Sequence, residues 1–197
     1  AMWEPMLKGK FGPHYQDVNM AWMWARIHAR TSRLGTYEGG FQAFADQFTD
    51  ILKDMGLVLH LSTPVSHISQ DLIVQSTRGE EPFERVLVTT SPQLLSRLVP
   101  ELPDHYHQGL RDLKSMRAMV LTLSLEHHLS PQGYYWYNIP KEKGFPFLAV
   151  VEHTNFLSPD YFGGDHIVYC GDYLVPDHEY FDLPKEEILS IYLPGLA

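Results

Sequence analysis

The sequence predicts an α+β protein with a mixed, largely antiparallel sheet and helices, and three observations support this fold class. Short apolar runs separated by turn residues follow one another at 57–90 and again at 118–174, as antiparallel strands do. Helical patterns lie before and after these groups of strands. Helices therefore do not alternate regularly with strands. A hydrophobic content of 44% with 20% charged residues is typical of a globular chain that buries a core.

Three helices are expected in the first 55 residues. A short helix is expected at Trp3–Gly12, where a glycine and then a proline follow. Asp17 is expected to cap the next helix, Val18–Arg30, by accepting a hydrogen bond from a free backbone N–H. Apolar groups on nearly every side of that helix predict that it is covered on most faces. The third, Phe41–Met55, has one apolar stripe opposite its polar residues, which is the amphipathic pattern.

The next apolar runs are predicted to form an antiparallel meander. Turn signals at Pro64 and at Arg78-Gly79-Glu80 separate them. The expected strands are Leu57–Leu61, Val65–Ile68, Leu72–Val74 and Phe83–Thr90.

The second half is expected to contain three helices and four strands. One helix starts at Ser91-Pro92 and ends before Pro100, and a second covers His105–Leu113. The last helix, Pro184–Tyr192, has proline at its start and two glutamates near its positive end. The expected strands are Ala118–Leu125, Tyr134–Ile139, Phe147–Glu152 and His166–Leu174.

Charge and composition exclude several function classes. The formal charge of −9 and the scattering of the 15 basic residues argue against nucleic acid or an anionic membrane as a partner. No run of about 18 apolar residues occurs, so no integral membrane segment is expected, and no signal peptide is visible. The single cysteine, Cys170, allows no disulfide within the chain, and we expect it to be a small buried residue. These features predict a cytoplasmic location.

Metal and hydrolase chemistry are not favoured by any motif. His105 and His107 lie in an expected helix, where a spacing of two points the rings apart. The sequence has neither a His-Glu-x-x-His motif nor a Gly-x-Ser-x-Gly motif. We therefore expect no metal site, and the sequence marks no catalytic residue.

One set of motifs occurs in an order that is typical of a protein family. Gly39-Gly40 precede the helix Phe41–Met55, and Gly56, a short apolar run and Val65-Ser66-His67-Ile68 follow. An apolar segment ending in small hydroxylated residues and proline, Val86–Pro92, comes next. In this order, over residues 35–100, the motifs resemble the flavin-dependent amine oxidase superfamily, in particular its protoporphyrinogen oxidase and phytoene desaturase-like members.

The resemblance implies FAD as the cofactor of the intact parent protein. It implies that Val65 offers backbone groups to the adenine, and that Thr89, Thr90 and Ser91 lie near the cofactor. The glycine pair Gly39-Gly40 belongs to the same set. The alternative is that Val65 and residues 89–91 are ordinary strand residues.

A dinucleotide-binding unit also needs a Gly-x-Gly-x-x-Gly segment between a strand and a helix, and this sequence has none. We therefore expect the central part of a two-domain flavoprotein. Residues 1–36 and 93–197 would belong to the substrate domain, and residues 37–92 would be part of the FAD domain. Such a fragment is expected to be inactive, to bind FAD weakly and to self-associate through surfaces exposed by truncation.

Aromatic residues supply candidates for a substrate pocket. In the run Tyr134–Tyr137, alternate residues share one face of a strand, so one face could line a large apolar pocket. The alternative is that one face is core and the other ordinary surface. The candidate pocket residues are Trp22, Trp24, Tyr37, Tyr135 and Tyr137.

Two functional hypotheses from different classes follow. In the first, the chain is part of an FAD-dependent oxidoreductase that oxidises a C–N or C–C bond of a small apolar or amine-bearing substrate. In the second, it is a non-enzymatic module that binds an apolar ligand or a protein partner.

Overall fold

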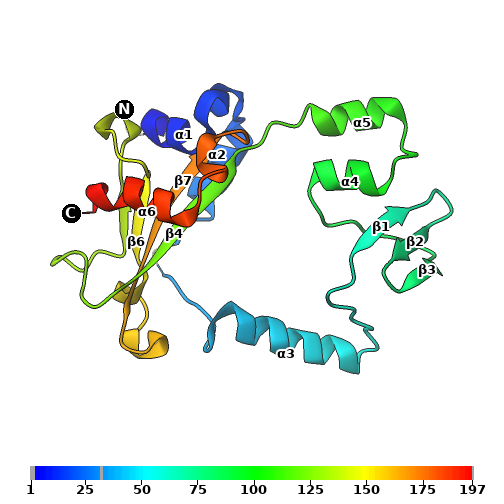
Figure 1. Cartoon of the computed structure of the whole chain (residues 1–197), viewed down its shortest axis with the longest axis horizontal. Helices are drawn as coiled ribbons and strands as arrows, with labels where there is room; N and C mark the ends of the chain where they lie inside the picture. Colours follow the sequence, from blue (N-terminus) through cyan, green and yellow to red (C-terminus); the bar gives the residue numbers. More distant parts are fainter. Residues whose placement is uncertain (1–2, 32, 197) are drawn as a thin grey trace. The chain divides into compact units, whose positions relative to one another are not determined.

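The computed structural model describes residues 3–31 and 33–196, and these residues form two compact units. The sheet unit comprises Ala1–Ala25 with Lys114–Ala197, and the meander unit comprises Arg26–Leu113. The geometric boundaries thus differ from those of the predicted domains, and the roles assigned to those domains remain predictions. Figure 1 shows the elements of both units.

The sheet unit is built on four antiparallel strands in the order β4-β7-β6-β5. Their bounds are β4 (Arg117–Leu125), β5 (Trp136–Asn138), β6 (Ala149–Glu152) and β7 (His166–Leu174). The register places Leu121 opposite Cys170, Cys170 opposite Val150, and Val150 opposite Tyr137. These residues therefore share one face of the sheet, and the four strands expected in the second half are confirmed.

That face carries the core of the sheet unit. The helix α6 (Lys185–Tyr192) packs Ile188 and Tyr192 against it. Phe147 is 1% exposed and Val168 is equally buried, so both lose nearly all contact with water. Burial of apolar side chains is the main force that stabilises such a core.

The N-terminal elements of the sheet unit agree only in part with those predicted from the sequence. The helix α1 (Trp3–Phe11) is confirmed, and the 3-10 helix η1 (Gly12–Asp17) follows it. Lys10 of α1 donates a hydrogen bond to the Tyr173 hydroxyl of β7 at 3.0 Å. This bond attaches the helix to the central strand.

The expected cap at Asp17 is wrong. The helix α2 is Met20–His28, and Asn19 caps it by accepting a hydrogen bond from the Trp22 N–H at 2.9 Å. Because η1 extends through Asp17, the first free N–H groups lie too far along the chain for its carboxylate. Asp17 instead pairs with Lys114 at 2.7 Å.

The expectation that this helix is covered on most faces is also wrong. No residue of α2 is buried, and Met20 and Trp24 are largely exposed. An apolar pattern shows which residues would gain from burial, but it does not show that a neighbouring element is present.

The amphipathic helix of the meander unit is α3 (Gly40–Asp54), which confirms the prediction. Gly39 has φ +78°, and a Cβ there would lie 2.8 Å from the Cβ of Ala43, so the helix start requires glycine. After α3, Gly56 takes φ +98°, and the Leu57 N–H donates to the Leu52 carbonyl at 2.9 Å.

A three-stranded antiparallel sheet in the order β1-β2-β3 and two helices complete the meander unit. Their bounds are β1 (Val65–Ile68), β2 (Ile73–Ser76), β3 (Gly79–Pro82), α4 (Pro92–Leu98) and α5 (Asp104–Arg111). Ser91 caps α4 by accepting a hydrogen bond from the Leu94 N–H at 3.3 Å. Both helices were expected from the sequence.

Two predicted strands do not form, and one strand was missed. Leu57–Leu61 and Phe83–Thr90 have no regular secondary structure, whereas Gly79–Pro82, read as part of a turn, pairs with β2. A strand needs a neighbouring strand for its backbone hydrogen bonds, and hydrophobic periodicity does not report whether one is available.

No helix in the described part of the chain is both long and apolar enough to cross a lipid bilayer.

We expect the substitution Phe147→Ala to lower the free energy of unfolding of the sheet unit by about 3–5 kcal/mol, because it leaves a cavity in the core. Urea denaturation followed by circular dichroism measures this change. Trp136→Ala is the matched control, since Trp136 is half exposed on the other face of the sheet. A loss for Trp136→Ala as large as that for Phe147→Ala would contradict the assignment of the core.

Candidate functional site

An apolar hollow lies within the meander unit. It has a volume of about 410 Å³ and is bounded by the β1–β2 turn, the segment leading to α4, and the helices α4 and α5. Val86 and Val88 face it, whereas Leu87 between them is almost fully exposed. Its other apolar lining residues are Ile68, Leu72, Leu95, Val99, Leu102, Pro103 and Tyr106.

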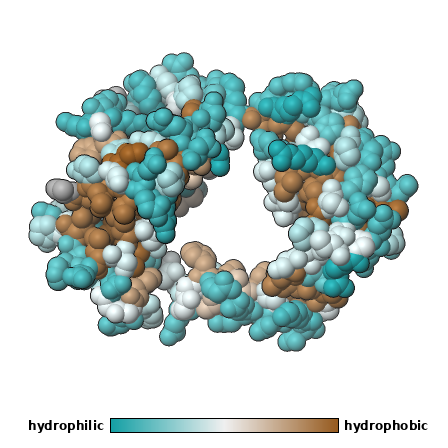
Figure 2. All heavy atoms as spheres, viewed as in Figure 1, coloured by the Kyte–Doolittle hydropathy of each residue, from teal (hydrophilic) through white to brown (hydrophobic). Residues whose placement is uncertain are grey.

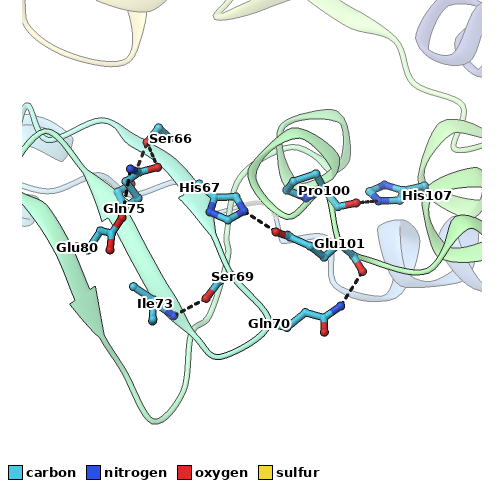
Figure 3. Close-up of polar contacts among 10 residues, drawn as sticks. All are labelled: Ser66, His67, Ser69, Gln70, Ile73, Gln75, Glu80, Pro100, Glu101 and His107. Carbon is cyan, nitrogen blue, oxygen red and sulfur yellow. Dashed lines mark hydrogen bonds and ion pairs between the residues drawn. The ribbon is translucent and has the colours of Figure 1, made fainter.

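One side of the hollow has a polar rim, and Figure 3 shows its hydrogen bonds. His67 Nε2 lies 2.9 Å from Glu101 Oε1, and Gln70 donates to the Glu101 carbonyl at 3.1 Å. The pKa of Glu101 is lowered, first by a hydrogen bond from its own backbone N–H and then by His67. The rim therefore holds a carboxylate close to an apolar surface.

His107 of α5 connects this helix to α4 and to the loop between them. Its Nε2 lies 3.2 Å from the Pro100 carbonyl, and its Nδ1 lies 2.6 Å from Ser96 Oγ (the bond to Pro100 is drawn in Figure 3). A carbonyl can only accept, so Nε2 carries the proton and Nδ1 accepts from the serine hydroxyl. Both ring nitrogens are thus used inside the fold, and no sequence motif indicated this role.

The six residues predicted to bind the cofactor all lie in the meander unit. Gly39 and Gly40 form the start of α3, and both have positive φ. Val65 begins β1, which is an edge strand because it pairs only with β2. The remaining three, Thr89, Thr90 and Ser91, lead into α4, which packs against β1.

Among these residues, Gly39 has a structural role at the start of α3, and so does Ser91 at the start of α4. Its side chain is the cap of α4. Val65 has an open main-chain edge, and Thr89 has no regular secondary structure. Main-chain contact to a ligand is therefore geometrically open at these two positions, and cofactor binding by them remains a prediction.

The predicted pocket residues are divided between the two units. Tyr37 belongs to the meander unit, where its ring stacks on Phe44 at 4.5 Å. Trp22 of the sheet unit packs edge-on against Phe11 at 4.9 Å. Trp24 lies on the same helix as Trp22. A common pocket formed by these aromatic residues remains a prediction.

Tyr137 packs against the core of the sheet unit, whereas Tyr135 precedes β5 and its ring lies 5.5 Å from that of Phe156. Tyr137 is half-buried, and its hydroxyl bonds to Ser130. Ser130 in turn donates to Glu152 through its hydroxyl and, at 3.3 Å, through its backbone N–H.

Glu152 is the functional candidate that the sequence reasoning missed. It is only 2% exposed, although it carries a carboxyl group. Its position two residues after Val150 places it on the core face of β6, which is the signal that could have revealed it. The bonds from Ser130 tie the loop between β4 and β5 to β6.

No metal centre is assembled in residues 3–31 and 33–196, where no group of three or more His, Cys, Asp or Glu side chains is arranged to hold an ion. Burial raises the pKa of the Cys170 thiol to about 11. The thiol therefore stays protonated and is a poor nucleophile at neutral pH.

Comparison with known proteins decides the family. The sequence matches the family of flavin-containing amine oxidoreductases over residues 7–197, almost its whole length. The chain belongs to this family. No curated protein is significantly similar to it in sequence.

Solved structures of longer proteins share the fold of this amine oxidoreductase chain. An oxidoreductase from Methanosarcina mazei matches with TM-score 0.63 and 17% identity, covering 81% of this chain and 38% of its own. A protein assigned as a protoporphyrinogen oxidase from Exiguobacterium sp. 255-15 gives TM-score 0.67 and 15% identity, covering 98% and 46%. A triple mutant of putrescine oxidase with redesigned cofactor binding gives 0.58 and 19%, covering 81% and 35%. The chain thus spans less than half the length of each.

We expect His107→Ala to destabilise the meander unit by about 1–3 kcal/mol, because it leaves the Ser96 hydroxyl and the Pro100 carbonyl without their partner. Hydrogen exchange of the α4 and α5 amides measures the effect. His105→Ala is the matched control, since His105 is an exposed histidine on the same helix. Equal exchange in the two variants would show that His107 does not connect the helices.

We expect Cys170 to react with iodoacetamide at pH 8 much more slowly in the folded chain than in urea, because the thiol is buried and protonated. The folded state holds the proton more tightly than the unfolded state. Stability from this group is therefore complete below pH 9 and is lost as the pH rises towards 11. Comparison with Cys170→Ala isolates this loss, and a rapid reaction of the folded chain would contradict the burial.

Proposed function

We propose that this chain forms the substrate-side sheet and the adenine-side segment of an FAD-dependent oxidoreductase. The reaction is the oxidation of a C–N or C–C bond in a small apolar or amine-bearing substrate. The match to the flavin-containing amine oxidoreductases over residues 7–197 carries this proposal. Bound flavin would accept the hydride equivalent, and the protein would supply binding and orientation.

The geometry of the meander unit supports the adenine-side role. The outer edge of β1 leaves main-chain groups near Val65 open to a ligand. An adenine edge presents both donors and acceptors, so main-chain N–H and C=O groups can recognise it without a polar side chain. Gly39 and Gly40, which have no side chain, permit close approach of a ligand to the backbone at the start of α3.

The pyrophosphate of the cofactor has no equivalent cradle in this sequence. Without a Gly-x-Gly-x-x-Gly turn, the backbone cannot approach the phosphates at a helix N-terminus. In the proposal, another part of the intact enzyme supplies this cradle. The chain by itself is then inactive and binds FAD weakly.

The sheet unit would supply most of the substrate pocket, in a protein located in the cytoplasm. Aromatic rings suit an apolar substrate because they offer large rigid surfaces, and their polar tips can orient an amine. The residues proposed for this pocket are Trp22, Trp24, Tyr37, Tyr135 and Tyr137.

A second candidate function is the binding of an apolar ligand without chemistry. The hollow beside Val86 and Val88 favours it, because the hollow is lined mainly by apolar side chains within a single unit. In that case an apolar probe such as toluene would shift the methyl resonances of these two valines, and adenine nucleotides would have no effect.

We expect AMP at millimolar concentration to shift the amide resonances of Val65, Gly40 and Thr89 in the 22.7 kDa chain, measured by NMR. AMP carries the adenosine half of FAD and needs no pyrophosphate cradle. Ribose 5-phosphate is the control, since it lacks the adenine and should leave these resonances unchanged. Shifts that are absent, or that occur equally with both ligands, would contradict the adenine-side role.

A further inference from the structure

A buried carboxyl group in the sheet unit is the end point of a small hydrogen-bond network. Glu152, the last residue of β6, is 2% exposed, so its side chain has almost no contact with water. Both of its carboxyl oxygens accept hydrogen bonds from Ser130: Oε1 from the hydroxyl, and Oε2 from the backbone N–H at 3.3 Å. The Ser130 hydroxyl also bonds to the Tyr137 hydroxyl of β5. The network therefore joins Tyr137 to Glu152 through Ser130.

The chemistry of the three groups fixes the direction of these hydrogen bonds. An ionised carboxylate has no proton and can only accept, so the Ser130 hydroxyl donates its single proton to Glu152. Towards Tyr137 the Ser130 oxygen can then only accept, so the Tyr137 hydroxyl donates its own single proton to Ser130. The Tyr137 oxygen keeps no proton for a further partner. It can accept another hydrogen bond but cannot donate one.

The sheet holds both ends of the network in place. Pairing of β5 with β6 places Tyr137 opposite Val150, and the Glu152 N–H donates to the Tyr135 carbonyl at 3.0 Å. Tyr137 packs against the apolar core, and Figure 2 shows apolar side chains gathered over the sheet unit where α6 lies. Hydrogen bonds beside such a core are stronger than in water, because the local dielectric constant is low.

We propose that Glu152 is a positioning residue that acts through Ser130 and holds the Tyr137 hydroxyl so that its oxygen offers a ligand only an acceptor. Tyr137 is one of the residues proposed for the substrate pocket, so the role towards a ligand rests on the proposed function. Tyr137 is only half-buried, whereas Glu152 is too buried to touch a ligand itself. The pocket then favours a ligand group with an N–H or O–H donor over a group that offers only lone pairs.

The substitution Glu152→Gln, which keeps the shape of the side chain, should reverse the network. The Ser130 backbone N–H can only donate, so the amide oxygen takes this bond. The amide NH2 group then faces the Ser130 hydroxyl and donates to it. Ser130 in turn donates its proton to the Tyr137 oxygen, and the Tyr137 hydroxyl proton becomes free to point towards a ligand. The substitution thus turns Tyr137 from an acceptor into a donor.

Two small aromatic ligands test this reversal. Pyrrole has an N–H donor and no free lone pair, whereas pyridine at pH 8 has a lone pair and no N–H donor. NMR titration of the chain, followed at the Tyr137 ring resonances, gives their dissociation constants. We expect the original chain to bind pyrrole about threefold or more tighter than pyridine, which is the size of one net hydrogen bond, and Glu152→Gln to prefer pyridine instead.

Ser130→Ala is the matched control, because it interrupts the network and keeps the carboxylate. The Tyr137 hydroxyl can then turn either way, so the preference between the two ligands should disappear. If Glu152 only stabilised the fold, Glu152→Gln would weaken the binding of both ligands alike. Equal weakening, a pyridine preference in the original chain, or the same preference in all three proteins would overturn the proposal.

Urea denaturation tests the network without a ligand. We expect Tyr137→Phe to shift the unfolding equilibrium about fivefold towards the unfolded state, and to have almost no effect in Ser130→Ala, where the partner of the hydroxyl is missing. Equal effects in the two backgrounds would refute the network. If the two backgrounds differ but neither ligand shifts the Tyr137 resonances, the assignment of Tyr137 to the substrate pocket is wrong, and the ligand preference is refuted with it.

Discussion

Main-chain hydrogen bonding between strands is the constraint on which the rest of this molecule depends. In the sheet unit it is satisfied: β7 pairs with β4 over nine residue pairs on one side and with β6 on the other. This pairing fixes the alternation that sends Cys170 and Val168 to the face covered by α6. The same alternation places the carboxyl group of Glu152 on that face, where hydrogen bonds from Ser130 offset the cost of its burial.

The meander unit satisfies the constraint only in part. Its three short strands pair with one another, and His107 joins the two helices that follow. Leu57–Leu61 and Phe83–Thr90 have no strand beside them. In this unit the incomplete pairing and the proposed function coincide, because an adenine edge could use the open main chain at Val65.

Elements with a strong period could be predicted from the sequence. The stripe of α3, the alternation along β4 and the proline before α6 each report local structure directly. Elements that depend on a partner distant in sequence could not be predicted. The pattern of Leu57–Leu61 is that of a strand, but no strand adjoins it, and the link between His107 and Ser96 depends on how two helices pack. The family was read from ordered motifs and confirmed by the match over 7–197, whereas the site residues remain predictions.

Native-state hydrogen exchange of the chain tests the central claim most directly, namely that β7 is paired on both sides while Val86–Thr90 of the meander unit has no strand beside it. Amides of β7 should exchange most slowly, because the central strand opens only with the core. Amides from Val86 to Thr90 should exchange nearly as fast as those of an unfolded peptide. Equal protection of β7 and of Val86–Thr90 would contradict the claim, since it would require a neighbouring strand within the meander unit.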